Sequence, residues 1–217
     1  KSPAWQVVNT SSGGSSTIRA TATNASGNVY MAGRFAGTTA RFGPITLTNT
    51  DSYGNISDSL VAKVTGTENT GQLTWVQQTG GAGNDRIQAP GINGTSLHVA
   101  GTYNSTSPTF DNLTFASTGP SSNMFVTKLT DTGLSGSLNW AQQGGQGIGY
   151  VNVLAVSGTK LYLAGEFYES MATLGTTSLT NANPSTNDIF VAKRTDMGTA
   201  GSFTWAQRAG RTGREGA

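Results

Sequence analysis

The sequence contains no cysteine, which excludes disulfide bonds, thiolate metal sites and cysteine nucleophiles. Charged residues are also scarce, at 11% of the chain against roughly 25% in typical domains. The single histidine, His98, lacks the sequence context of a hydrolase triad or a zinc protease. No apolar run approaches the roughly 20 residues of a membrane-spanning helix, so we expect the chain not to span a membrane. These absences leave few groups for catalysis, and we expect a protein that is not an enzyme.

Positive charge is thinly spread. The 217 residues include 13 Lys and Arg against 11 Asp and Glu, for a formal net charge of +2. A nucleic-acid-binding surface needs clustered positive charge, and basic residues gather only in the tail, at Arg208, Arg211 and Arg214. We therefore predict no nucleic acid partner.

What the sequence does contain is a repeated phrase. It reads Trp75-Val-Gln-Gln-Thr-Gly-Gly, then Trp140-Ala-Gln-Gln-Gly-Gly, then Trp205-Ala-Gln-Arg-Ala-Gly, with a weaker copy at Trp5. Recurrence about every 65 residues indicates a repeat architecture.

Each repeat contains the same four strand signals. In the first, alternating apolar and polar residues predict strands over 17–22, 29–35, 59–65 and 72–78. A longer excursion separates the second and third strands and is expected to form a hairpin-like insert on one rim. Thirty glycines and few long helix formers also favour an all-β chain.

Four antiparallel strands in each repeat predict a fold of the β-propeller type, with three blades. We place 1–217 in a single repeat domain, with blades at about 10–79, 80–144 and 145–210. Residues 1–9 form a surplus strand of the fourth type, which has no sheet of its own. Closed propellers have four to eight blades, so three blades leave the fold incomplete.

Several residues recur at equivalent positions and are expected to be structural. A mid-strand glycine follows alanine in each second strand, which is typical of a bulge or a close approach of neighbouring backbone. The tryptophans of the fourth strands are expected to fill the space between adjacent sheets. The two sets are Gly33, Gly101 and Gly165, and Trp5, Trp75, Trp140 and Trp205.

A lysine recurs on each third strand, at Lys63, Lys128 and Lys193. The three side chains either form a ring of charge around one face or occupy outward, solvated strand positions. We favour the solvated position, because buried lysines are rare.

No cofactor is predicted. His98 takes the strand position of Tyr30 and Tyr162 and is interpreted as a partly buried, aromatic-like filler. Calcium needs only oxygen ligands, so loops such as Asn84-Asp85 and Asn187-Asp188 are weak candidates, but no dense Asp-x-Asp-x-Asp loop exists.

The repeat resembles the bacterial SBBP-type β-propeller repeats of secreted and surface proteins of Bacteroidota. The resemblance rests on the series Gly-Asn-Val-Tyr-Met-Ala-Gly-Arg-Phe, Phe-Gly-x-x-x-Leu, Leu-Val-Ala-Lys-Val and Leu-Thr-Trp-x-x-Gln-x-Gly-Gly, and covers essentially the whole chain. It implies export, surface attachment through a parent protein, and a role as a scaffold or adhesion module. It carries no catalytic residues over.

The sequence thus predicts a non-catalytic structural or adhesive module, extracellular or on the bacterial surface. Its incomplete fold fits a fragment of a larger propeller, a six-bladed ring of two copies, or a fibre in which the surplus strand enters a neighbour's sheet. We favour self-association, as a homo-oligomer or polymer. The alternative is a carbohydrate-binding, lectin-like propeller module of a larger adhesin, with surface glycans as partners.

Overall fold

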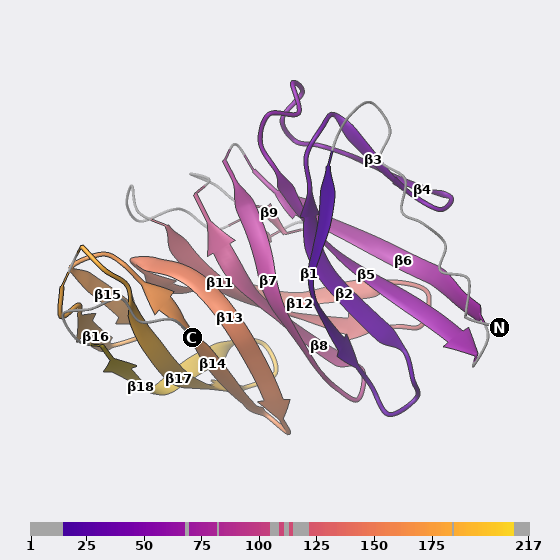
Figure 1. The fold of residues 1–217 in the computed structure, drawn as a ribbon. Helices are drawn as coiled ribbons and strands as arrows, with labels where there is room; N and C mark the ends of the chain where they lie inside the picture. Colours follow the sequence, from indigo (N-terminus) through magenta and orange to yellow (C-terminus); the bar gives the residue numbers. More distant parts are fainter. Residues whose placement is uncertain are drawn as a thin grey trace.

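The computed structural model consists of strands joined by turns (Figure 1). The described residues, which contain no helix that could cross a membrane, are 15–67, 70–81, 83–104, 109–110, 113–114, 122–183 and 185–210. The all-β prediction is confirmed. Trp5 and the expected surplus strand at 1–9 lie outside the described residues.

Three four-stranded antiparallel units follow one another along the chain. Within each unit the strands pair in the order first, second, third, fourth. Unit 1 comprises β1 (Ser16–Thr23), β2 (Val29–Phe35), β5 (Asp58–Thr67) and β6 (Thr70–Gly80). Unit 2 comprises β7 (Asp85–Asn93), β8 (Ser96–Tyr103), β11 (Asn123–Asp131) and β12 (Gly136–Gln146). Unit 3 comprises β13 (Ile148–Ser157), β14 (Lys160–Phe167), β17 (Asp188–Asp196) and β18 (Gly201–Ala209).

The excursion between the second and third strands of each unit is a hairpin. The hairpins are β3 (Thr39–Phe42) with β4 (Ile45–Thr48), β9 (Thr109–Phe110) with β10 (Leu113–Thr114), and β15 (Met171–Leu174) with β16 (Thr177–Thr180). The hairpin of unit 2 pairs with β6 of unit 1, and the hairpin of unit 3 pairs with β12 of unit 2. Each of these two hairpins therefore links its unit to the preceding sheet.

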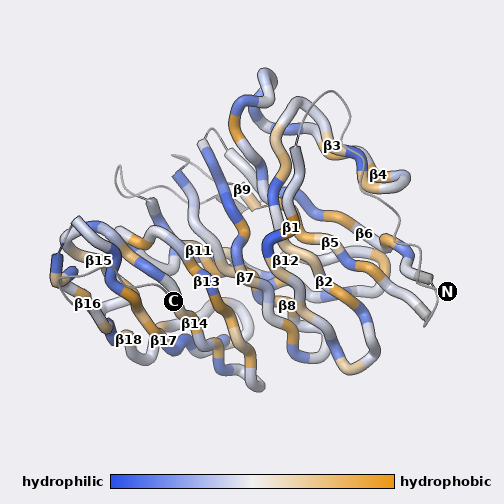
Figure 2. The backbone as a smooth tube through the Cα atoms, in the orientation of Figure 1, coloured by the Kyte–Doolittle hydropathy of each residue, from blue (hydrophilic) through white to orange (hydrophobic). Residues whose placement is uncertain are grey.

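The three units lie side by side in an open, curved arrangement, with β7 between β1 and β13 (Figure 1). The described residues do not close into a ring. Hydropathy alternates along the strands in short segments, as expected for sheets with two different faces (Figure 2). The apolar side chains form three clusters, two of which combine residues from neighbouring units. Burial between sheets therefore holds the units together.

A glycine and a bulge define the same place in every unit. A Cβ atom on Gly33, Gly101 or Gly165 would collide with the backbone carbonyl oxygen of the paired first strand. Beside that contact the register of the first strand shifts by one residue in each unit. The residues passed over by the shift are Arg19, Gln88 and Asn152. The expected close backbone approach is thus present, and it comes with a repeated β-bulge.

Candidate functional site

A buried carboxylate joins unit 2 to unit 1. Asp131 lies at the end of β11 and accepts hydrogen bonds from Lys63 Nζ at 2.6 Å, Tyr30 Oη at 2.5 Å and Trp75 Nε1 at 3.3 Å. All three donors belong to unit 1. Lys63 and Tyr30 donate to Oδ2, whereas Trp75 donates to Oδ1, which also accepts the backbone N–H of Gly133. The φ of Gly133, 97°, suits the tight turn that follows. We call this arrangement, an Asp-x-Gly turn held by an aromatic side chain, a lysine and a tryptophan, the carboxylate clamp.

The clamp is a desolvated ion pair with its hydrogen bonds satisfied. Burial alone would raise the pKa of Asp131, but hydrogen bonds from Lys63 and Tyr30 outweigh it and lower the pKa to about 2. Burial and the neighbouring carboxylate raise the pKa of the Tyr30 hydroxyl, so that it stays protonated and donates. A carboxylate with several charge-assisted or buried donors is stabilised in its ionised form.

The clamp is repeated between units 2 and 3 without its tryptophan contact, because Trp140 Nε1 is buried and has no hydrogen-bond partner among the described residues. Asp196 accepts hydrogen bonds from Lys128 Nζ at 2.7 Å, from the Gly198 backbone at 2.9 Å and from His98 Nε2 at 3.1 Å. His98 thus takes the place of Tyr30, as its strand position predicts. Burial lowers the pKa of His98, which favours the neutral ring with a proton on Nε2. The expectation of a partly buried, aromatic-like filler misses this polar contact, and the side chain is fully buried.

The glutamine of the repeated phrase makes a second contact between units. Gln77 Nε2 donates to the carbonyl oxygen of Gly136 in unit 2. Gln142 Oε1 accepts the backbone N–H of Gly201 in unit 3, at 2.7 Å. A Cβ atom on Gly136 would lie 3.0 Å from the Trp75 ring, so glycine lets the indole lie against the backbone. The phrase Trp-x-Gln is therefore a set of contacts between neighbouring units.

Unit 3 presents the same side chains at its outer end. Tyr162, Lys193 and Trp205 are cross-strand partners, in the register that Tyr30, Lys63 and Trp75 have in unit 1. Tyr162 and Trp205 are each 38% exposed, whereas Tyr30 is fully buried and Trp75 is 4% exposed. Lys193 Nζ lies 5.9 Å from the centre of the Tyr162 ring and makes no ion pair within the described part of the chain. Gln207 is exposed beside them. We call Tyr162, Lys193, Trp205 and Gln207 the end face.

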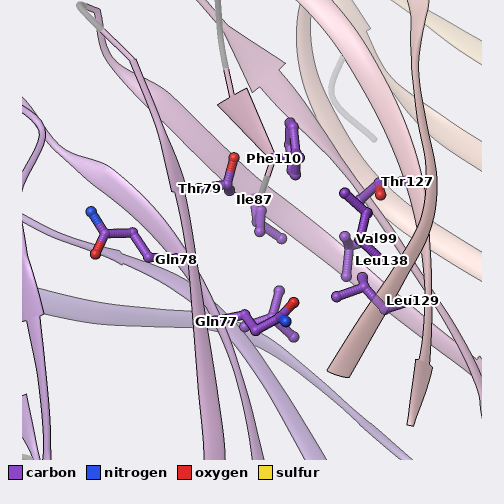
Figure 3. Close-up of a pocket in the computed structure, with 10 residues that line it drawn as sticks. Gln77, Gln78, Thr79, Ile87, Val99, Phe110, Thr127, Leu129 and Leu138 are labelled. Atoms are coloured by element: carbon purple, nitrogen blue, oxygen red, sulfur yellow. The ribbon is translucent and has the colours of Figure 1, made fainter. Parts of the chain in front are cut away.

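The spaces between neighbouring units are partly filled. A small apolar cavity of ≈ 20 Å³ lies between units 1 and 2, with Ile87, Val99 and Leu129 among its walls (Figure 3). The corresponding space between units 2 and 3 is a polar groove of ≈ 280 Å³, because Arg194 stands where unit 2 has Leu129. Arg194 lies over Trp140 and Phe203, and burial lowers its pKa to about 10. The smaller cavity has room for about one water molecule and is a packing feature.

A larger cavity lies where the first strands of the three units meet. It has a volume of ≈ 530 Å³, and its walls come from β1, β2, β7 and β13. Three arginines line it, none of which makes an ion pair within the described residues. The lining residues are Arg19, Arg34, Arg86, Ile87, Gln88, Tyr150, Val151 and Asn152.

The repeated bulge puts polar side chains into this cavity. The bulge residues Arg19, Gln88 and Asn152 all belong to its wall. Bulges commonly redirect a side chain next to a binding site. Burial, followed by repulsion from Arg86 and Arg19, lowers the pKa of Arg34, which shows that the guanidinium groups act on one another. Arg86 Nε is buried and finds no hydrogen-bond partner in the described part of the chain.

The recurring lysines differ from the solvated positions that we favoured. That interpretation is wrong for Lys63, which is 4% exposed and paired with Asp131. Lys128 is paired as well, and only Lys193 has no carboxylate partner in the part of the chain that is described. The sequence contains a signal for these pairs, because an aspartate recurs three residues after the lysine in units 2 and 3. Each aspartate pairs with the lysine of the preceding unit.

Each loop considered for calcium uses one side-chain oxygen within the protein, whereas Asp188 Oδ1 is buried and has no hydrogen-bond partner among the described residues. Asn84 Oδ1 accepts the backbone N–H of Ser57, and Asp188 accepts hydrogen bonds from Arg208 and from the Ala182 backbone. Among the described residues, no group of three or more His, Cys, Asp or Glu side chains is placed to hold a metal ion.

In comparisons with known proteins, no protein-family model and no curated protein matches the chain.

Proposed function

We propose that the chain is a non-catalytic structural module made of propeller-type blades, which works by docking a further blade of the same type on its end face. The observation that carries the proposal is the end face itself. It repeats, at the exposed side of unit 3, the tyrosine, lysine, tryptophan and glutamine with which unit 1 contacts unit 2; the lysine and the glutamine also make the contacts between units 2 and 3. The buried titratable groups Lys63, His98, Asp131 and Asp196 are engaged between units, which also supports a structural role.

The clamp specifies the chemistry of the partner. At each internal boundary the end of one unit receives an aspartate from an Asp-x-Gly turn of the next. The docking partner is therefore a blade whose third strand ends in such a turn. Continuity with the two internal boundaries and the positive charge of Lys193 both favour this occupant.

A second copy of this chain, placed head to tail, does not supply that turn. Gly66 of unit 1 pairs with Gly71 in the register in which Asp131 pairs with Gly136 and Asp196 with Gly201. Unit 1 therefore presents no carboxylate at this position. The partner proposed is a further blade with the aspartate, and direct self-association of this chain becomes an outcome of the test.

The test is to append a fourth unit. A copy of residues 145–210 is fused after Gly210, so that its Asp-x-Gly turn faces the original end face. We expect one cooperative unfolding transition. Replacing the aspartate of the appended turn (Asp196→Asn in the copy) should destabilise the extended chain by about 3 kcal/mol, because Lys193 is then buried without a partner. Glu169→Gln in the copy is the matched control and should have little effect.

Two results would contradict the proposal. The first is an appended unit that unfolds separately and is insensitive to loss of its aspartate. The second is a dimer of the unextended chain in light scattering that Lys193→Ala abolishes, which would make a second copy the occupant in place of an Asp-x-Gly blade. Location on the bacterial surface and a contribution to adhesion belong to the same proposal and rest on the resemblance to SBBP repeats.

A second candidate function, carbohydrate binding, is favoured by one specific observation. The cavity between the first strands has polar side chains from all three units and a size in the range of small-molecule sites.

A further inference from the structure

We infer that the arginine-lined cavity binds an acidic sugar, with its carboxylate held by Arg34 and Arg86 and its hydroxyl groups facing the Gln88 carboxamide. The inference rests on the second candidate function, carbohydrate binding, and names its ligand. It does not depend on the docking of a further blade.

The cavity is built to receive negative charge. Arg19, Arg34 and Arg86 line one cavity, and burial together with the two neighbouring guanidinium groups lowers the pKa of Arg34. None of the three guanidinium groups has a carboxylate partner within the described residues, although buried carboxylates are used to pair lysines elsewhere in the same molecule. A cluster of like charge that the fold leaves uncompensated is expected at a functional position. Arginine forks match the geometry of a carboxylate.

The unsatisfied donor of Arg86 points to the same ligand. Its Nε is buried and has no hydrogen-bond partner among the described residues. A buried donor without a partner is unfavourable, and an oxyanion bound in the cavity would supply the acceptor.

The remaining wall suits hydroxyl groups. Gln88 uses its carbonyl oxygen to accept the Val151 backbone N–H, so its two N–H donors remain for a ligand. Tyr150 is 41% exposed and offers a ring face together with a hydroxyl group. The Gln88 carboxamide and the Tyr150 ring beside a cationic pocket match a hydroxylated ring that carries a carboxylate. A nucleic acid fits less well, because its phosphates need positive charge along an extended path and these arginines share one cavity.

The experiment is isothermal titration of the intact chain with trigalacturonate, with galactotriose and sodium sulfate in separate arms. We expect trigalacturonate to bind at least tenfold more tightly than galactotriose, since a charge-assisted pair contributes about that factor. Arg34→Gln and Arg86→Gln should each weaken it about tenfold or more. Arg41→Gln is the matched control, because Arg41 is an exposed arginine of β3 outside the cavity, and it should leave the affinity unchanged.

Each other outcome overturns a defined part of the inference. Equal binding of the neutral and acidic trisaccharides would remove the anion site and leave carbohydrate binding in place. Sulfate that binds as tightly as trigalacturonate and displaces it would reduce the site to a bare oxyanion pocket. Binding that is insensitive to both arginine substitutions, or no binding of any of the three probes at millimolar concentration, would overturn the inference. Melting curves confirm that the variants fold, and loss of mutual repulsion should leave their melting temperatures unchanged or raised.

Discussion

At the scale of single residues, equivalent lysines have different surroundings. Lys63 and Lys193 occupy the same register on the third strands of units 1 and 3. Lys63 is buried against Asp131, while Lys193 lies over the ring of Tyr162 with no ion pair in the described chain. The role of a residue in this repeat therefore depends on whether another unit follows.

This difference gives a matched pair of variants. We predict that Lys63→Ala lowers the free energy of unfolding by about 3 kcal/mol, because it leaves Asp131 buried without its cation. Lys193→Ala should change it by less than about 0.5 kcal/mol, as for other positions outside a buried network. Urea denaturation measures both. Similar losses for the two variants would show that the ion pair with Asp131 is not what stabilises unit 1.

The same carboxylate makes stability depend on pH. Asp131 has a pKa of about 2 in the folded chain, against an ordinary value of 3.8. The ionised Asp131 carboxylate therefore adds about 2 kcal/mol to the free energy of unfolding at every pH above about 4. This contribution is lost as the pH falls toward about 2 and the carboxylate is protonated.

We therefore predict that Asp131→Asn is less stable than the unmodified chain at pH 6, and that the difference narrows between pH 4 and pH 2. Denaturant titrations across this range measure it. A difference that stays constant with pH would mean that Asp131 titrates normally in the folded chain.

At the scale of strands, a mid-strand glycine and the neighbouring bulge act together. Gly101 lies under the carbonyl oxygen of Arg86, next to the bulge at Gln88. The close approach accompanies the bulge, and the bulge residue Gln88 belongs to the cavity wall. A substitution at the glycine should therefore affect both the stability of the sheet and the shape of the cavity.

We predict that Gly101→Ala destabilises the chain by about 3 kcal/mol, because the added methyl group meets both the Arg86 carbonyl and the Phe125 ring. Gly71→Ala is the control. A Cβ atom there meets only the Val64 side chain, at 3.3 Å, and should cost less than about 1 kcal/mol. Thermal melts compare the two, and a tolerated alanine at position 101 would contradict the close approach.

Strands were predictable from the sequence because their signal is local. Alternation predicts 29–35 and 59–65, and the structure has Val29–Phe35 and Asp58–Thr67. The partner of each excursion hairpin was not predictable. Pairing of β9 with β6 or β15 with β12 connects different units and leaves no mark in the composition of either segment.

At the scale of the whole molecule, the contacts between units could not be predicted from the sequence. Asp131 and Lys63 are far apart in the chain, so their pairing becomes visible only when the units are stacked. The same holds for Arg19, Arg34 and Arg86, which lie on β1, β2 and β7 and meet because β7 packs against β1 and β2. The strand order was readable from one repeat, whereas the candidate sites belong to no single repeat.

Stability should accordingly be divisible by unit, as in other repeat proteins. We predict that Asp196→Asn speeds amide hydrogen exchange mainly in unit 3, because it breaks the clamp between units 2 and 3. Asp131→Asn should speed exchange mainly in unit 1. Hydrogen–deuterium exchange with mass spectrometry separates the two patterns, and uniform acceleration throughout the chain would indicate a single cooperative block.

The clamp has a direction: one side of a unit offers the carboxylate and the other side receives it. An in-frame gene duplication of one middle unit therefore brings its own matching boundaries, and the array grows without the evolution of a new interface. Gly66 breaks this rule at the first unit, where the carboxylate is missing. Copies of units 2 and 3 extend the array with a carboxylate at every new boundary. A copy of unit 1 inserted into the middle of the array would create a boundary without the carboxylate, where neighbouring units would separate more easily.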